Sequence, residues 1–273
     1  MQFYFRKLKD LKEESDIMTL KKIKKYIYYL SILIFTGFII ISCKSSDNTK
    51  PQNAKEMYDI AMKKFQDEDW EEANQLFEVI KLQYAASQYA DDAQYHIAEI
   101  NFNKGQFILA AYNYNSLRRT YPTSPYFKEA LFKAGLCYYK LSPPYDRDQE
   151  YTVKAIDVFQ SYQHLYAGDS LSTEAGNFID ELRNKLGHRA FFTAQLYLKL
   201  HNSKAALIYF DIVIDEYPDT QYFEMAHYEK IKILYNSSRH EELMLAIKKY
   251  KTLFPKGKYI KEVEEIEKNI TRD

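Results

Sequence analysis

The feature that most constrains the fold of this 273-residue chain is an internal repeat of 37 residues. Short segments that begin with an aromatic residue, usually followed by proline, and end with tyrosine recur at 84–89, 121–126, 217–222 and 254–259. The first two segments lie 37 residues apart, and so do the last two. The same step separates two sets of small residues, namely Ala61, Ala98 and Gly135, and Ala73 and Ala110. A period of this length is typical of solenoids, whose units bury their apolar faces against one another.

Each unit has the apolar spacing of two amphipathic helices. In the first unit, apolar residues at steps of three and four run from Met57 to Phe65 and resume from Ala73 to Tyr84, after a polar turn at 66–69. Proline after the second helix ends it, because proline lacks the N–H and clashes with the preceding turn. Only 7 Gly and 7 Pro are present, which leaves little material for the tight turns of a β-fold. We therefore predict an all-α fold, a superhelical solenoid of five tetratricopeptide-like helix pairs.

The repeat predicts where the pairs lie. They cover residues 54–90, 91–127, 128–172, 187–223 and 224–260, within a repeat domain at 54–273. The third pair is lengthened by a loop at 142–148, and a longer helical connection at 173–186 joins it to the fourth. Two positions depart from the pattern, since Ala85 stands where proline is usual and Leu243 where alanine is usual.

The N-terminal region has the three parts of a secretory signal peptide. A basic segment precedes an apolar run at 26–41, and Ser42 stands directly before Cys43. The run is shorter than the roughly 20 residues of a transmembrane helix, so an uncleaved membrane anchor is the weaker alternative. We predict a signal peptide at 1–42, cleavage between Ser42 and Cys43, and a flexible polar tether at 43–53.

Residues 1–17 make an unusual start, because four of them are acidic where a signal peptide is basic. Met18 is followed by a normal basic segment, and we predict that it is the true first residue. The chain holds 38 basic and 38 acidic residues, of which eight basic and four acidic ones lie in residues 1–42. The mature chain is therefore expected to carry a net charge of −4.

Residues 40–43, Ile-Ile-Ser-Cys, resemble the lipobox of bacterial lipoproteins. The resemblance implies that Cys43 receives a diacylglycerol on its thiol and a further acyl chain, such as palmitate, on its new amino group. More than one acyl chain gives stable membrane anchoring. The resemblance thus implies attachment to the membrane through a lipid at Cys43.

Residues 43–255 together resemble the BamD (ComL or YfiO-type) family of outer-membrane-protein assembly lipoproteins. The resemblance rests on the five repeats, their Tyr-Pro closing segments, the Asp-Arg-Asp loop at 146–148 and the run from 186 to 221. It implies a non-enzymatic scaffold of the β-barrel assembly machinery on the periplasmic face of the outer membrane. Its expected partners are BamA, other Bam subunits and unfolded outer-membrane β-barrel proteins awaiting insertion.

Two other functions stay open at this point. A different periplasmic tetratricopeptide lipoprotein could coordinate cell-envelope division or peptidoglycan synthesis. A glycan-binding lipoprotein built on such repeats fits less well, because those proteins are much longer and carry a large domain outside the repeats.

Aromatic or apolar residues recur at positions five and twelve of each predicted pair. Position five holds Tyr58, Tyr95, Phe132, Phe191 and Tyr228, and position twelve holds Phe65, Phe102, Tyr139, Leu198 and Tyr235. Residues seven apart share one helix face, so these side chains either line a peptide groove or pack between repeats as core. Both interpretations stay open from the sequence.

The family resemblance assigns expected roles to some of these residues. It implies that the first repeats receive an extended segment of a β-barrel substrate, with contacts from Tyr58, Phe65, Tyr95, Glu99, Phe102 and Asn103, and with Asp92 close by. It also implies that the last two repeats dock on BamA, with contacts from Arg189, Tyr228, Lys232 and Tyr235.

Neither an enzyme nor a nucleic-acid-binding protein is expected. The six histidines show no metal-ligand spacing, and no nucleophile-elbow or phosphate-loop motif occurs. Cys137 lies between apolar residues of a predicted helix and is expected to be a small buried side chain. Balanced charges give no basic footprint for nucleic acid. We therefore expect no cofactor, no metal, no small-molecule substrate and no nucleic-acid partner.

Overall fold

The computed structural model describes residues 53–237 and 239–271, which belong to one compact unit of the chain. The predicted signal peptide, the Met18 start, the acylation of Cys43 and all of the tether except Asn53 lie outside the described residues.

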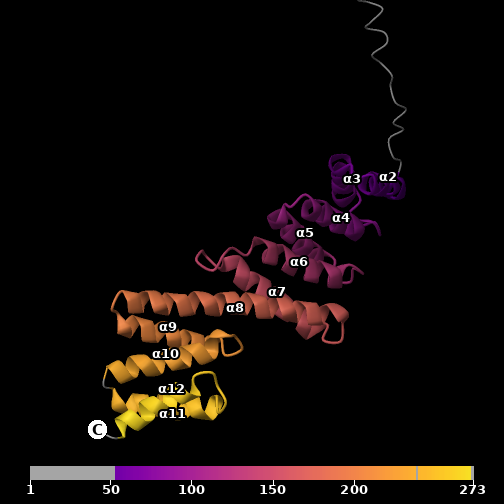
Figure 1. Cartoon of the computed structure of the whole chain (residues 1–273). Helices are drawn as coiled ribbons and strands as arrows, with labels where there is room; N and C mark the ends of the chain where they lie inside the picture. Colours follow the sequence, from indigo (N-terminus) through magenta and orange to yellow (C-terminus); the bar gives the residue numbers. More distant parts are fainter. Residues whose placement is uncertain (1–52, 238, 272–273) are drawn as a thin grey trace, which may run out of the picture. The chain divides into compact units, whose positions relative to one another are not determined.

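The described residues form eleven α-helices and contain no β-strand (Figure 1). The helices are α2 (Ala54–Gln66), α3 (Trp70–Gln83), α4 (Ala90–Asn103), α5 (Phe107–Thr120), α6 (Phe127–Leu141), α7 (Glu150–Leu165), α8 (Ser170–Lys199), α9 (Ser203–Glu216), α10 (Tyr222–Asn236), α11 (His240–Leu253) and α12 (Ile260–Ile270). Over these residues no helix combines the length and the hydrophobicity that a membrane crossing requires. The predicted all-α fold is confirmed.

Each helix packs on the one before it and the one after it, from α2 through to α12. Figure 1 shows the same order, with successive helices lying across one another in a stack. Further contacts skip a helix: α8 also reaches α6, α10 also reaches α8, and α12 also reaches α10. Contacts between near neighbours in the sequence are those of a tetratricopeptide-like solenoid.

Small residues at the 37-residue step lie where the two helices of a pair cross. Ala61, Ala73, Ala98 and Ala110 are fully buried. A Cβ atom on Gly135 would lie 2.7 Å from a ring carbon of Phe159. The helices of each pair therefore approach closely only because these positions carry little or no side chain.

In the first, second and fourth pairs, the turn between the two helices contains one left-handed residue. Glu68, Gly105 and His201 have φ values of 59°, 71° and 56°, and each stands at position fifteen of its pair. Only Gly105 is a glycine, so the other two turns hold a side chain in a backbone region that favours glycine.

An aromatic residue caps the second helix of every pair. Its N–H donates to the carbonyl four residues earlier, and its carbonyl accepts the N–H of the residue three positions later. These caps are Tyr84, Tyr121, Tyr166, Tyr217 and Phe254. The bonds form equally in the first pair, where alanine replaces proline after the cap, and around Tyr166, which the sequence pattern missed.

The long helix α8 is the main departure from five equal pairs. The lengthened connection predicted at 173–186 does not end before the fourth pair but continues into its first helix, so that α8 has 30 residues. Non-helical residues 142–149 separate α6 from α7 where a loop is predicted. The helix α12 was not predicted, and its Val263 is buried against the last pair.

Candidate functional site

The aromatic residues at position five form packed ring pairs. In four repeats the ring lies against the tyrosine that ends the closing segment of the same repeat, at the start of the next helix. The ring centroids are 4.9 Å apart for Tyr58 and Tyr89, 4.3 Å for Tyr95 and Tyr126, 5.4 Å for Phe191 and Tyr222, and 4.3 Å for Tyr228 and Tyr259. The position-five aromatics therefore pack on the closing tyrosines, which lie where one pair ends and the first helix of the next element begins.

Tyr95 and Glu99 belong to a partly buried polar cluster between repeats. The Tyr95 side chain is only 5% exposed. The Glu99 carboxylate accepts hydrogen bonds from the Lys133 ammonium, with Nζ 2.6 Å from Oε2, and from the Tyr114 hydroxyl. Burial, with the neighbouring carboxylates, raises the pKa of Tyr95. The expectation that Tyr95 opens onto a peptide groove is therefore corrected, because neighbouring helices bury its ring. Glu99 is half-buried, and its substrate contact stays a prediction.

The remaining residues of the predicted substrate groove are more accessible. Tyr58, Phe65 and Phe102 are half-buried and Asn103 is exposed. The Phe65 ring packs edge-on against Trp70, with their centroids 5.2 Å apart. These three rings are thus partly accessible on the first two pairs, and the Asn103 side chain is exposed.

Of the charged groups near this region, Asp92 is half-buried. Burial raises the pKa of its carboxyl, while a hydrogen bond from Tyr126 opposes the shift. The Lys133 ammonium lies over the rings of Tyr95 and Phe102, at 5.7 and 6.0 Å from their centroids. These charged groups therefore contact aromatic side chains of the neighbouring repeat and are not simply solvated.

The four residues predicted to dock on BamA fall into separate places. Lys232 lies over the Tyr228 ring, 5.2 Å from its centroid, and pairs with Glu229 on the same helix. Tyr235, at the end of α10, is 40% exposed. Arg189 lies on α8, where its guanidinium donates to the carbonyl of Arg147 at 2.9 Å.

Arg189 lines a cleft between the inserted loop at 142–149 and the C-terminal half of α8. The cleft has a volume of about 420 Å³. Its lining residues are Tyr145, Asp146, Arg189, Phe192, Thr193, Gln195, Leu196 and Lys199. The Tyr145 ring holds the loop against α8 through His188, whose centroid is 4.1 Å away. A second tie is the 2.8 Å hydrogen bond from Lys185 to Ser142.

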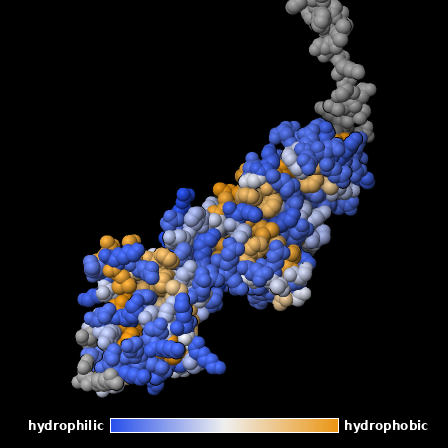
Figure 2. Space-filling view, in the orientation of Figure 1, coloured by the Kyte–Doolittle hydropathy of each residue, from blue (hydrophilic) through white to orange (hydrophobic). Residues whose placement is uncertain are grey.

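One edge of this cleft is an exposed apolar stripe on α8. Phe192, Leu196 and Leu200, spaced by four residues, are 42%, 55% and 64% exposed. In Figure 2 hydrophobic side chains reach the surface at the end of α8 that joins α9. Sequence analysis missed this stripe, although apolar residues at this spacing, beside the buried Phe191 and Ala194, make the helix apolar on two faces.

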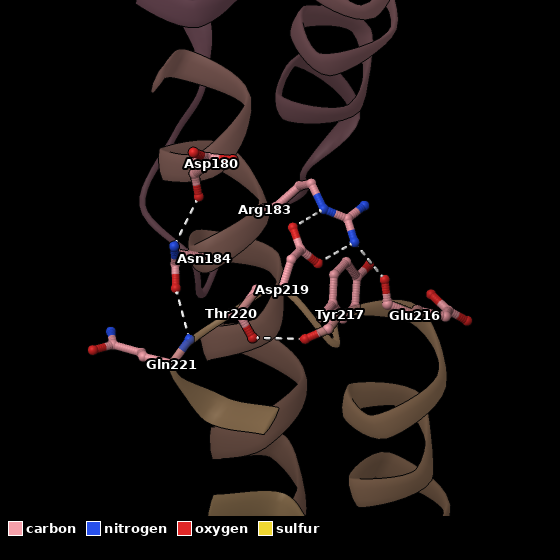
Figure 3. A network of polar contacts seen from close by, with 8 residues as sticks. All are labelled: Asp180, Arg183, Asn184, Glu216, Tyr217, Asp219, Thr220 and Gln221. Atoms are coloured by element: carbon pink, nitrogen blue, oxygen red, sulfur yellow. Dashed lines mark hydrogen bonds and ion pairs between the residues drawn. The ribbon is translucent and has the colours of Figure 1, made fainter. Parts of the chain in front are cut away.

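The middle of α8 is clamped to the closing segment of the fourth pair (Figure 3). The Arg183 guanidinium binds both carboxylate oxygens of Asp219 at 2.5 Å and donates to the Glu216 carbonyl at 2.8 Å. Asn184 accepts the N–H of Gln221 at 3.2 Å. This paired guanidinium–carboxylate geometry fixes α8, and with it the apolar stripe, relative to α9 and α10.

The described residues offer little material for chemistry. No group of three His, Cys, Asp or Glu side chains within them is placed to hold a metal ion. Cys137 is fully buried, as predicted, and burial raises the pKa of its thiol to about 12. The surface of this part of the chain also exposes apolar and aromatic side chains, among them Tyr112 and Phe192.

A family model described as YfiO, outer membrane lipoprotein, matches residues 50–244. The chain belongs to this family of outer membrane lipoproteins. The predicted membership of the BamD, or YfiO-type, family is therefore confirmed. The match covers the first two helix pairs and the whole of α8, and it ends inside α11.

Three relatives in this family carry the name outer membrane protein assembly factor BamD. The protein of Pasteurella multocida is 21% identical over 232 residues, which cover 79% of this chain and 84% of the relative. That of Rickettsia prowazekii is 23% identical over 246 residues, or 88% of this chain and 96% of the relative. That of Caulobacter vibrioides is 21% identical over 174 residues, or 64% and 57%.

Among solved structures, the chain is similar to a tetratricopeptide repeat protein from Parabacteroides merdae. The two are 13% identical, and the match covers 78% of this chain and 98% of the other. The TM-score is 0.26, which carries no argument about the fold. The assignment of a tetratricopeptide-like solenoid for this family member rests on the helix pairs themselves.

Proposed function

We propose that this chain is a non-enzymatic scaffold of the β-barrel assembly machinery. It recognises unfolded outer-membrane β-barrel proteins and docks on BamA, alongside other Bam subunits, for their insertion into the outer membrane. Family membership and the names of the relatives support this function. Coordination of envelope division or peptidoglycan synthesis has no comparable support among the observed features.

The observation that carries the docking proposal is the exposed apolar stripe on α8. Phe192 and Leu196 line a cleft bordered by Arg189 and Lys199. Aromatic and arginine anchors in such a recess are typical of the energetic centre of protein interfaces. The Arg183 clamp holds the stripe rigid, so little ordering entropy is lost on binding. We assign the stripe and Arg189 to the BamA contact, with Tyr228, Lys232 and Tyr235 on α10 as a separate second contact.

Substrate recognition is proposed for the first two pairs. Half-buried Tyr58, Phe65 and Phe102, with exposed Asn103, offer ring edges and an amide to an extended segment. Tyr95 acts there by holding the neighbouring helices rather than by contact, whereas Glu99 stays a proposed substrate contact. Side-chain edges suit the alternating apolar residues of a β-strand that has not yet paired.

Attachment to the membrane is proposed through a diacylglycerol on the Cys43 thiol, removal of residues 1–42 and acylation of the new amino group of Cys43. The resemblance of residues 40–43 to a lipobox supports this anchor, and the outer membrane lipoprotein family supports its location. The repeat domain then lies on the periplasmic face. Mass spectrometry of the membrane-bound chain is expected to show a start at Cys43 with the added mass of the acyl chains, and a chain that retains residues 1–42 would contradict the anchor.

A pull-down from detergent-solubilised membranes tests the docking proposal. We expect Leu196→Glu to lower the recovery of BamA at least about tenfold, because a buried, unpaired carboxylate costs several kcal/mol at an interface. Leu82→Glu is the matched control, since Leu82 is also exposed, at 74%, but lies on α3. Equal recovery from both variants would contradict the assigned surface, and recovery of only division or cell-wall proteins would contradict the function.

A further inference from the structure

The exposed face of α5 is apolar where the same face of the preceding repeat is acidic. Ile108, Leu109 and Tyr112 are 58%, 51% and 63% exposed. The residues 37 positions earlier, on α3, are Glu71, Glu72 and Gln75. In Figure 2 hydrophobic side chains also reach the surface over the part of the chain that carries α4, α5 and α6. Packing inside the solenoid does not explain these side chains, because the repeat accepts charged ones at the same positions.

The register of this comparison is fixed by buried alanines. Ala73 on α3 and Ala110 on α5 are 37 residues apart, and both are fully buried. The residues one and two positions before each alanine, and the residue two positions after it, therefore point the same way on both helices. The contrast between Glu-Glu-Gln and Ile-Leu-Tyr is a difference in the surface alone.

The charges around this face suit a negatively charged surface. Residues 100–128 contain no acidic residue and four basic ones. Two of the four have carboxylate partners, Lys104 with Glu71 and Lys128 with Asp169. Arg119 is exposed and stands seven residues after Tyr112, hence on the same face. An apolar face with a tyrosine and one exposed arginine at its border matches the headgroup layer of a bilayer.

The length of chain before the described residues brings α5 within reach of a bilayer. Asn53 follows Cys43 by ten residues, which span at most about 35 Å when fully extended. Successive helices from α2 to α5 pack on one another, at roughly 10 Å per step. An anchor at Cys43 therefore keeps the first two pairs beside the membrane surface.

We propose that the exposed face of α5, formed by Ile108, Leu109 and Tyr112 with Arg119 at its border, lies in the headgroup layer of the membrane that holds the lipid anchor. This inference rests on the proposed acylation of Cys43. The contact adds a second point of attachment beside the acyl chains. It thereby fixes which side of the first two pairs turns toward the periplasm.

A tryptophan in place of Tyr112 tests this contact. The acylated chain, with Trp70→Phe to remove its own tryptophan, carries either Tyr112→Trp or the matched control Gln75→Trp. Each is reconstituted in vesicles of phosphatidylethanolamine and phosphatidylglycerol at 3:1, with or without brominated acyl chains. Flotation of the vesicles first establishes that the chain is anchored, and circular dichroism that it is folded.

Brominated lipid is expected to quench the fluorescence of the Tyr112→Trp variant at least about twofold more than that of the Gln75→Trp variant. Equal quenching of the two variants in chains that float would overturn the α5 contact and leave the anchor standing. A blue-shifted emission from Tyr112→Trp that brominated lipid does not quench would also overturn the contact, and would indicate a protein partner or second copy on this face. Failure to float would count against the anchor itself. The pair Leu109→Trp and Glu72→Trp repeats the test at the adjacent position if Tyr112→Trp disturbs folding.

Discussion

The aromatic residues of the first two pairs and the apolar residues of α8 have opposite fates in the fold. Tyr95 belongs to a series that recurs in every repeat, and its ring is stacked on Tyr126 and shut off from solvent. Phe192, Leu196 and Leu200 belong to no such series, and they are open. Tyr95, which recurs at the 37-residue step, contacts the tyrosine at the start of the next pair, whereas these three apolar residues, which break the step, are open to other partners.

The same distinction separates other parts of the molecule. Small residues, capping aromatics and left-handed turns recur, and all of them shape the packing of helix on helix. The loop at 142–149, the Arg183 clamp and the apolar face of α5 occur once, and each bears on a surface. A periodic sequence therefore identifies its own framework, and its exceptions indicate where function is to be sought.

The largest expected effect is the loss of a recurring ring. Tyr95→Ala should lower the free energy of unfolding by about 3 kcal/mol, because it opens a cavity between repeats. Leu196→Ala, on the exposed stripe, should change it by less than about 0.5 kcal/mol. Urea unfolding followed by circular dichroism measures both. Similar losses from the two variants would break the distinction between framework and surface.

Two buried histidines that do not recur are expected to make stability depend on pH. His96 and His227 are 9% and 3% exposed, and burial lowers the pKa of each to about 4. Lys249 and Lys230 lower the pKa of His227 further, while Asp215 opposes them. The unfolded chain takes up these protons near pH 6.5. Their contribution is therefore complete above pH 6.5 and is lost as the pH falls toward 4.

Replacing one of these histidines isolates its share. At about 1.4 kcal/mol per pKa unit, His227 accounts for at most roughly 3 kcal/mol of the acid-induced loss. His227→Leu should reduce the slope of unfolding free energy against pH between 6.5 and 4 by up to one proton. An unchanged slope in His227→Leu would mean that the buried ring is protonated in the folded chain.

A recurring small residue and a solitary glycine offer a smaller contrast. Gly135→Ala should cost about 1 to 3 kcal/mol, because the added methyl would lie 2.7 Å from the Phe159 ring. Gly168→Ala places its Cβ where no other atom lies within 4 Å, and it should be close to neutral. Midpoints of thermal unfolding rank the two, and a neutral Gly135→Ala would show that the crossing tolerates wider spacing.

The smallest expected effect is a gain in stability at a recurring turn. His201→Gly places glycine where the second pair already has Gly105, and it should raise the free energy of unfolding by about 0.5 kcal/mol, since relief of the left-handed strain outweighs the added entropy of the unfolded chain. Gly105→His is the reciprocal change and should lower it. Urea midpoints that shift by similar amounts in opposite directions would support the equivalence of these two turns. A lower midpoint for His201→Gly would contradict it.

The helix pairs could be predicted from the sequence because the same pattern of residues is repeated in five of them. The buried alanines, the polar turns and the closing aromatics each predict the same boundaries, so that an irregular copy such as the one at Ala85 is still recognised. The helix α12 lies beyond the last copy, although Ile260, Val263 and Ile266 give it an amphipathic spacing that could have been recognised.

The candidate site was less predictable, for a physical reason. Spacing shows that Tyr58 and Tyr95 share one helix face, but it does not show which neighbour covers that face. The covering rings, Tyr89 and Tyr126, come from the closing segments, and only the three-dimensional stack brings them there. Likewise, the continuation of α8 through residue 187 decides that Phe192 and Leu196 are exposed.

Hydrogen–deuterium exchange on the chain alone and in complex with BamA tests the central claim most directly. Binding is expected to protect the amides of the loop at 142–149 and of α8 after residue 189, where the non-recurring residues form the cleft. The helices α2 and α4, which are proposed to contact the substrate and not BamA, should exchange at the same rate in both samples. Protection confined to α2 and α4, with none in the loop and α8, would contradict the account.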